Sequence, residues 1–206
     1  MDADTVLQGW HDRSGEYSPD YYAYYGPNET SELINDRLDA VVDPDAAILE
    51  LGCSSGRHLA HLHDHGYQNL WGIDINGDAL DVMRQTYPDL ASAGTFHFDA
   101  IENVITDFDD GQFDVVFSVE TLQHIHQDNA WVFEEVARVA GDLLITVELE
   151  RDDGRASVGP PVTYVNDDFP LYYRNWRHIF TDLGFVEKES EKRGRDTFRL
   201  FRRAER

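Results

Sequence analysis

The chain has 206 residues, of which 41% are hydrophobic, and it carries a net charge of −23. This length and hydrophobic content fit one domain that folds without disulfide bonds or bound metal ions. The negative charge would repel nucleic-acid phosphates, so we expect no nucleic-acid partner. Cys53 is the single cysteine, which excludes an internal disulfide and a cysteine-based metal cluster.

No apolar run in the sequence is long enough to cross a bilayer, and the first residues, MDADTVLQGW, lack the basic and apolar regions of a signal peptide. We therefore expect a cytoplasmic protein with no membrane contact. Only two of the 17 basic residues are lysines, Lys188 and Lys192. This acidic, lysine-poor composition resembles that of cytoplasmic proteins from extreme halophiles. Because the acids are scattered, a solvated surface is favoured over a site for a cationic partner.

The N-terminal part is rich in tyrosine. Five tyrosines lie among the nine residues 17–25. They could form a lid over a ligand or an arm that packs its rings on a sheet, and the sequence does not separate these two interpretations. A capped helix is predicted to follow, beginning at Thr30 or Ser31 and reaching Val41.

The middle of the chain alternates between strand and helix patterns. Apolar runs of strand length occur at 46–51, 69–74, 95–100, 113–119 and 142–149. Helical spacing appears around Leu59 and Leu62, ending near Gly66, and again at 78–86 and 129–140, whereas the connection 101–112 has a weak helical pattern. Such alternation predicts an α/β fold with a parallel sheet covered on both faces.

The C-terminal third has a different pattern. Residues 149–169 are rich in Gly, Pro and Asp and predict a long loop, and residues 171–183 predict a helix that stops at Gly184. Alternating runs at 185–192 and 197–203 predict an antiparallel hairpin. This hairpin could bind an anion, or its charges could guard an edge strand against pairing. Its basic residues are Lys188, Lys192, Arg193, Arg195, Arg199, Arg202, Arg203 and Arg206.

The turn ELGCSSG (residues 50–56) joins the first core strand to the first core helix. Such a turn places backbone N–H groups and the positive end of a helix at the carboxyl edge of the sheet, where ligands bind in open parallel sheets. Gly52 and Gly56 are present, but Ser54 and Arg57 stand where a pyrophosphate-binding G-x-G-x-x-G has glycine. The G-K-[ST] ending of a P-loop is also missing, so a phosphate cradle is disfavoured.

Acidic residues follow the next two strands. Asp74 lies about 20 residues after Gly52, a spacing at which a carboxylate reaches ribose hydroxyls. Asp99 could accept a hydrogen bond from the exocyclic amine of adenine. Either acid alone could be merely a helix N-cap. The ordered set of strand ends is more specific and predicts a nucleoside ligand.

Four segments, E-L-G-C-S-S-G, G-I-D-I, F-D-A and F-D-V-V-F-S-V-E-T-L-Q-H-I, together resemble the successive motifs of class I S-adenosylmethionine-dependent methyltransferases, over residues 47–148. The resemblance implies a Rossmann-like three-layer sandwich. Its seven-stranded, mostly parallel sheet would end in an antiparallel C-terminal hairpin. S-adenosyl-L-methionine is the implied cofactor.

The resemblance also assigns the cofactor contacts. The methionine part of the cofactor would contact the turn, and the ribose would bind the acid after the second strand. The adenine would contact the residues that follow the second and third strands, and the fourth strand would form the inner wall of the site. The residues so assigned are Glu50, Gly52, Ser54 and Gly56, Asp74, Ile75, Asp99 and Ala100, and Ser118, Val119 and Leu122. Ser54 departs from the family, where glycine is common.

Methyl transfer from a sulfonium mainly requires alignment and exclusion of water. A hydroxyl or ammonium acceptor also needs a base, for which His124 is the best candidate, with Glu120 close by. His124 could equally pack on the cofactor or bond to backbone. Only two of the three neighbouring histidines at 61–65 would share a helix face and no carboxylate triad accompanies them, so we predict no metal site.

We therefore predict a single domain over residues 1–206, made of a tyrosine-rich arm and helix (1–43), a cofactor-binding core (44–150), and a substrate loop, helix and hairpin (151–206). The predicted activity is methyl transfer to oxygen or nitrogen of a small molecule such as a sugar or uronic acid of a glycan. Four arginines could recognise a carboxylated acceptor or simply form surface salt bridges: Arg151, Arg155, Arg174 and Arg177. The alternatives are a nucleotide-dependent Rossmann oxidoreductase and an S-adenosylmethionine-binding regulatory protein without turnover. The sequence leaves the oligomeric state open.

Overall fold

The computed structural model describes residues 1–150, 162–165 and 169–205. Two compact units can be distinguished, residues 10–104 and residues 1–9 together with 105–206. Each unit is described by itself below.

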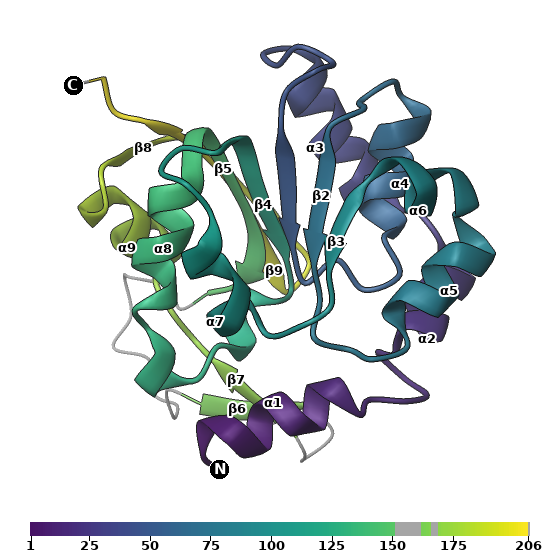
Figure 1. The fold of residues 1–206 in the computed structure, drawn as a ribbon. Helices are drawn as coiled ribbons and strands as arrows, with labels where there is room; N and C mark the ends of the chain where they lie inside the picture. The colour runs from purple at the N-terminus through teal and green to yellow at the C-terminus, as the bar shows by residue number, and fades with distance from the viewer. Residues whose placement is uncertain (151–161, 166–168, 206) are drawn as a thin grey trace. The chain divides into compact units, whose positions relative to one another are not determined.

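The unit of residues 10–104 is built on three parallel strands, β1 (Ile48–Leu51), β2 (Leu70–Ile73) and β3 (Thr95–His97) (Figure 1). β2 pairs with both neighbours. Every residue of β1 is buried, as expected for a strand covered on both faces. The helices of this unit are α2 (Pro19–Tyr25), α3 (Glu29–Asp39), α4 (Arg57–Asp64), α5 (Ala79–Thr86), α6 (Pro88–Ala93) and α7 (Ile101–Val104).

The predicted N-terminal helix begins slightly earlier than expected. The side chain of Asn28, rather than Thr30 or Ser31, caps α3, because its Oδ1 accepts hydrogen bonds from the amides of both those residues. Ser31 completes a capping box through its hydroxyl, which accepts a hydrogen bond from the Asn28 amide at 3.1 Å. Sequence patterns placed the helix correctly but missed the cap, because three candidate capping residues stand close together.

Helix α2 carries four of the five N-terminal tyrosines and packs against α5. The rings of Tyr21 and Tyr25 lie 4.9 Å apart, whereas Tyr24 is 84% exposed. The tyrosine-rich segment is therefore a helix that packs on a helix, and part of its aromatic surface faces solvent. Its role as a lid stays a prediction.

Gly72, in the middle of β2, is required by close packing. A Cβ atom at this position would lie 2.6 Å from the Cys53 sulfur and 3.0 Å from the Phe96 ring. Phe96 is partly buried, and Cys53 is a buried filler whose thiol pKa is raised by burial. The structure thus supports a packing role for the single cysteine rather than a nucleophilic one.

We expect Gly72→Ala to lower the free energy of unfolding by about 2 kcal/mol, because overpacking a closed core forces side chains or backbone to move. The melting temperature should then fall by about 4–8 °C. Gly77→Ala is the matched control, because its Cβ would meet His11 only at an ordinary 3.5 Å. Thermal denaturation of both variants measures the difference, and equal melting temperatures would contradict the packing argument.

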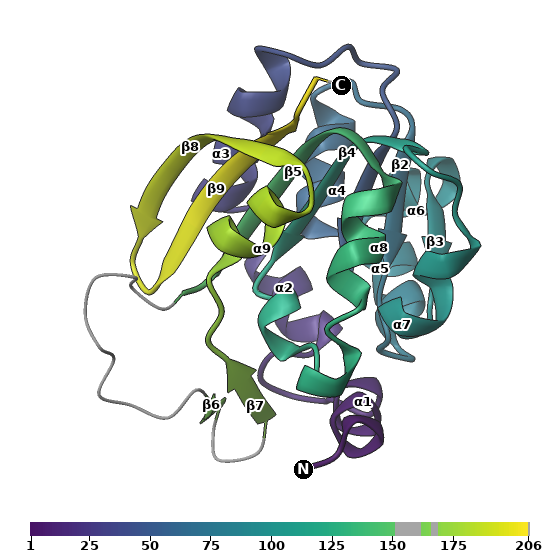
Figure 2. The same cartoon turned by 90° about the vertical axis from the view of Figure 1, so that its left-hand side faces the viewer.

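The unit of residues 1–9 and 105–206 contains β4 (Phe113–Val119), β5 (Ala140–Leu149), β8 (Phe185–Arg193) and β9 (Asp196–Arg203). β4 and β5 are parallel, whereas β9 is antiparallel to both β5 and β8. Figure 2 shows the β8–β9 hairpin with α9 (Trp176–Asp182) beside it. Helix α8 (Val132–Val139) packs on β4, β5 and α9. The remaining helices are α1 (Ala3–His11), which starts in this unit, and the 3-10 helices η1 (Ile105–Asp107), η2 (Leu122–His124) and η3 (Gln127–Asn129).

Two predictions in the C-terminal third are corrected. The predicted loop 149–169 contains strand β6 (Val162–Val165), and the start of the helix predicted at 171–183 belongs to β7 (Phe169–Tyr172), which pairs with β6. Helix α9 begins only after Asn175, whose Oδ1 accepts a hydrogen bond from the His178 amide. A short apolar run does not by itself distinguish strand from helix, and here the long-range pairing with β6 decides.

The strand order is β3-β2-β1-β4-β5-β9-β8. This confirms the predicted α/β class with a seven-stranded, mostly parallel sheet and an antiparallel C-terminal hairpin. None of the helices in the described part of the chain has the length and hydropathy needed to cross a membrane.

Candidate functional site

The turn after β1 has a sharply bent backbone. Gly52, Ser54 and Gly56 have positive φ angles of 74°, 50° and 83°. The amides of Gly52 and Cys53 both donate to the Ile73 carbonyl at the end of β2, at 2.8 and 3.0 Å. Glycine adopts such angles readily, but Ser54 does so at a cost that the surrounding contacts must offset.

Asp74 provides the contact that holds Ser54. Its Oδ2 accepts a hydrogen bond from the Ser54 amide at 2.7 Å, and its Oδ1 accepts one from the Asn76 amide at 2.8 Å. Burial raises the pKa of this carboxyl, and the two backbone hydrogen bonds oppose that rise. Helix α5 starts later, after Asp78, so Asp74 is not its N-cap. Each carboxylate oxygen has a second lone pair, so Asp74 can still accept hydrogen bonds from ribose hydroxyls.

Asn76 is a buried residue at this site that sequence patterns missed. Its Nδ2 donates to the carbonyls of Trp10 and Arg13, at 3.1 and 2.9 Å, and its Oδ1 accepts from the Asp78 amide. It therefore ties the N-terminal segment to the loop that presents Asp74. An asparagine two residues after a strand-end acid was the available signal, but its partners lie more than sixty residues away.

Glu50, the third residue of β1, is almost completely buried. Its Oε2 has no hydrogen-bond partner among the described residues. Burial raises the pKa of this carboxyl well above its usual value, against the opposing charge of Arg57. A buried carboxylate oxygen without a partner is costly, and a cationic ligand group would remove that cost. The position therefore fits the ammonium of an amino-acid ligand.

The surroundings of Asp99 differ from those of Asp74 and Glu50. It is exposed, and its Oδ1 accepts hydrogen bonds from the Ala100 amide at 2.7 Å and from the Asn103 side chain at 2.8 Å, at the start of α7. These contacts are local, and Asp99 precedes Ala100, whose carbonyl accepts the first hydrogen bonds of α7, so Asp99 is not the N-cap. Its predicted adenine contact stays a prediction. Ala100 is buried and Ile75 is partly buried.

In the other unit, the predicted inner-wall residues Ser118 and Val119 are the last two residues of β4, and Leu122 follows in η2. Ser118 is buried, and its hydroxyl donates to Glu148 Oε1 at 2.7 Å, so its polar group is engaged inside the protein. Val119 is partly buried and Leu122 fully so. Burial raises the pKa of Glu148 to about 7, against the hydrogen bonds that it accepts. A carboxylate near the end of a mostly apolar strand was the sequence signal for Glu148, and we did not predict it as a site residue.

His124 has the geometry of a neutral base. Its Nδ1 lies 3.2 Å from the Pro170 carbonyl oxygen, which can only accept, so Nδ1 carries the proton and Nε2 the lone pair. Burial lowers the pKa of the imidazole to about 4, which keeps the ring neutral at pH 7. The predicted alternative, a hydrogen bond from His124 to the backbone, is therefore present between Nδ1 and the Pro170 carbonyl. It does not exclude proton transfer, because the ring has a second nitrogen.

Glu120 is the weaker base candidate. It has a positive φ of 52°, and its Oε1 pairs with Arg195 Nη2 at 2.8 Å. Asp196 lies beside this pair, with Arg195 Nε 3.6 Å from its Oδ2. Burial and the neighbouring Glu120 raise the pKa of Asp196 to about 7. Because Glu120 is engaged in an ion pair with Arg195, it is a less suitable base than His124.

The raised pKa of Asp196 predicts a pH effect on stability. The folded protein holds this proton more tightly than the unfolded chain, so the group's stabilisation is complete below its ordinary pKa of 3.8 and is lost as the pH rises to about 7. Asp196→Asn removes this titration. When the pH is raised from 4.5 to 8, the melting temperature of the variant should therefore increase by about 4 °C relative to that of the wild type. A pH-independent difference between the two proteins would contradict the raised pKa.

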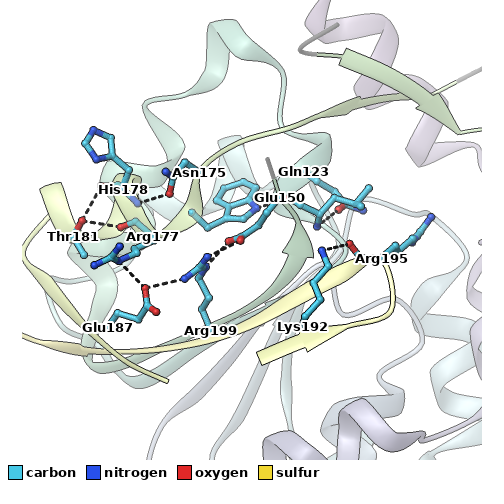
Figure 3. Close-up of polar contacts among 12 residues, drawn as sticks. Gln123, Glu150, Asn175, Arg177, His178, Thr181, Glu187, Lys192, Arg195 and Arg199 are labelled. Carbon is cyan, nitrogen blue, oxygen red and sulfur yellow. Dashed lines mark hydrogen bonds and ion pairs between the residues drawn. The ribbon is translucent and has the colours of Figure 1, made fainter. Parts of the chain in front are cut away.

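Four basic residues of the hairpin pair with acids of the same unit, and two others, Lys192 and Arg203, donate to backbone carbonyls. Figure 3 shows Arg199 between Glu150 and Glu187, and Arg177 on the other side of Glu187. Arg202 pairs with Asp142 at 3.1 Å. This pairing disfavours an anion-binding hairpin and supports the salt-bridge interpretation of Arg177.

The other arginines considered for acceptor recognition do not support it. Arg174 is largely buried, and its guanidinium stacks on the rings of Phe133 and Tyr172, at 4.9 and 5.0 Å. It is therefore neither a surface ion pair nor an exposed acceptor contact. Arg151 and Arg155 lie outside the described residues.

The histidine-rich stretch at the end of α4 makes local contacts. The rings of His61 and His65 are 4.3 Å apart, and His65 Nδ1 bonds to the His61 carbonyl. Within the part of the chain that the structure describes, no group of three or more His, Cys, Asp or Glu side chains is arranged to hold a metal ion.

Comparison with known proteins gives a consistent result. Residues 48–142 match a protein family described as a methyltransferase domain. An O-methyltransferase of Pyrenophora dematioidea is 27% identical over 136 residues, covering 62% of this chain and 51% of that protein. The O-methyltransferase cnsE of Penicillium expansum is 28% identical over 140 residues, covering 64% and 50%. The chain thus spans about half the length of these curated relatives.

Among solved structures, magnesium protoporphyrin IX methyltransferase from Synechocystis PCC 6803, with bound SAM, is similar. It has a TM-score of 0.65 at 17% sequence identity, over 98% of this chain and 90% of that one. At this identity the likeness shows a shared fold.

Proposed function

We propose that the chain carries a class I S-adenosylmethionine-dependent methyltransferase domain, which the methyltransferase-domain match over residues 48–142 supports, and that the whole protein transfers the methyl group of S-adenosyl-L-methionine to an oxygen, or a nitrogen, of a small molecule. The curated relatives include O-methyltransferases, which supports an oxygen acceptor. The sulfonium of the cofactor supplies an electrophilic methyl group, so the protein need only bind, align and keep out water.

The observation that carries this proposal is the arrangement of Glu50 and Asp74 around the turn after β1. The unpartnered Oε2 of Glu50 fits the ammonium of the methionine part. Asp74 fixes the Ser54 backbone and keeps lone pairs for the ribose hydroxyls. We propose that Asp99 and Ala100 meet the adenine edge. The glycines needed to approach a pyrophosphate are missing at Ser54 and Arg57, which disfavours the oxidoreductase alternative.

A hydroxyl acceptor fits better than a carboxylate. A carboxylate acceptor needs no base, whereas a hydroxyl must lose a proton, and His124 is a neutral imidazole with its lone pair on Nε2. The uronic-acid hypothesis rested on arginines, and both Arg174 and Arg177 are engaged within the protein. We therefore propose a hydroxyl group, on a sugar or a phenol, as the acceptor.

Calorimetry with S-adenosylhomocysteine and with NAD tests the cofactor assignment. Binding of S-adenosylhomocysteine without binding of NAD is expected, and the reverse result would overturn the proposal. Mass spectrometry after incubation with S-adenosyl-L-methionine and a panel of phenols, sugars and uronic acids tests the acceptor. Cofactor binding without any methylated product would favour the regulatory alternative.

A further inference from the structure

The 3-10 helix η2 (Leu122–His124) is held at its amino end by one buried carboxylate. Glu148 Oε1 accepts hydrogen bonds from the amides of Thr121 and Leu122, both at 3.1 Å, and its Oε2 accepts one from the Gln123 amide at 3.2 Å. Glu148 comes from β5, and its side chain is completely buried. An anion at the amino end of a helical turn satisfies the N–H groups that the turn itself leaves unpaired.

A buried cation holds the other end of the same turn. Arg174 donates to the carbonyl of Leu122 at 3.2 Å and to that of Ile125 at 2.5 Å. Its guanidinium lies over three aromatic rings, those of Phe133, Tyr172 and Trp176. These rings fix the position of the side chain, and cation–π contacts offset part of the cost of burying its charge.

A third contact joins the turn to the end of β5. The side-chain oxygen of Gln123 accepts a hydrogen bond from the Leu149 amide at 2.8 Å, next to Glu148 in the chain. Gln123 is itself buried. The turn is thus bonded to β5 through side chain and backbone, to Arg174 through carbonyls, and to Pro170 of β7 through the His124 ring.

We infer that Glu148 and Arg174 form a charge clamp that positions His124, so that Nδ1–H donates to Pro170 and Nε2 keeps the lone pair. Neither clamp residue is proposed to touch the acceptor; both act through the backbone of η2. The inference rests on the proposed function only in giving His124 the role of base. The placement of the ring itself does not depend on turnover.

Glu148→Gln and Arg174→Lys test the clamp. Glutamine would turn an NH2 group toward the Gln123 amide or toward the other donors, and lysine would lose the planar stacking and the paired hydrogen bonds. Glu187→Gln is the matched control, because it alters a carboxylate of the same unit that pairs with Arg177 and Arg199, outside the clamp.

Nitrogen-15 NMR of the histidine side chains measures the tautomer of His124. The His124 signals are assigned by comparison with the spectrum of His124→Asn. The Nδ1–H tautomer is expected in the wild type and in Glu187→Gln, and a tautomer mixture in both clamp variants. Amide exchange at Thr121–Gln123 should be about tenfold faster in those variants. Circular dichroism verifies folding, so a clamp variant that unfolds is set aside and the other decides.

An Nε2–H tautomer in the wild type would overturn the inference, and so would an unchanged tautomer in the folded clamp variants. With an acceptor in hand, kcat of the clamp variants should fall on the order of tenfold, since small misplacements of a reacting group are costly. Failure of the proposed function would instead appear as absent cofactor binding or absent product in the wild type, with the tautomer result intact.

Discussion

Asp74→Ala is expected to weaken S-adenosylhomocysteine binding about 100-fold. The carboxylate accepts hydrogen bonds from the amides of Ser54 and Asn76, at 2.7 and 2.8 Å, and would also accept from the ribose. Two lost hydrogen bonds to a charged group cost about 3 kcal/mol together, which corresponds to that factor. The loss includes the turn itself, because Ser54 has a left-handed backbone that the Asp74 contact stabilises.

Isothermal titration calorimetry measures this effect, with Asp81→Asn as the matched control. Asp81 is an exposed acid of the same unit, on α5, and pairs only loosely with Arg84 at 3.3 Å. The control should bind like the wild type. An Asp74→Ala affinity within about threefold of the wild type would show that the turn does not depend on this carboxylate.

His124→Asn should lower kcat by a factor of about 10²–10⁴, the usual contribution of a general base. Asparagine can still donate a hydrogen bond toward the Pro170 carbonyl, so the local structure is retained while the basic Nε2 is lost. Cofactor affinity should be unchanged. Because burial lowers the imidazole pKa to about 4, the wild-type rate should stay flat around neutral pH and fall only in acid, as the ring becomes protonated.

The measurement is the initial rate of product formation by mass spectrometry, with an acceptor found in the panel. His178→Asn provides the control, since that ring lies on the exposed side of α9 and pairs with Asp182. A normal rate in the His124→Asn variant would contradict the role of His124 as the base and would indicate a packing role for this residue instead.

The core elements followed directly from local patterns. Strand β4 has the predicted bounds, and the hairpin of β8 and β9 lies where alternation placed it. The turn at residues 50–56 was also recognisable, because glycine at positive φ leaves a local signature between an apolar strand and an amphipathic helix. Such features depend on neighbours in the chain, which a single sequence displays.

The supporting contacts were not recognisable from the sequence. Asn76 bonds to Trp10 and Arg13, and Glu148 bonds to a turn more than twenty residues earlier. Arg174 was considered for an acceptor and instead holds η2 from inside the protein. A polar side chain looks the same in sequence whether it faces solvent or satisfies a buried backbone group.

The sequence by itself determined the α/β architecture, the position of the turn proposed to hold the cofactor, and the choice of His124 as the base candidate, because periodicity, glycine placement and motif order can be read along the chain. Only the tertiary structure decided that Leu171 belongs to a strand, that Glu120 pairs with Arg195, and that His124 carries its proton on Nδ1. These outcomes depend on partners distant in sequence, since burial and hydrogen-bond geometry are set where separate segments meet.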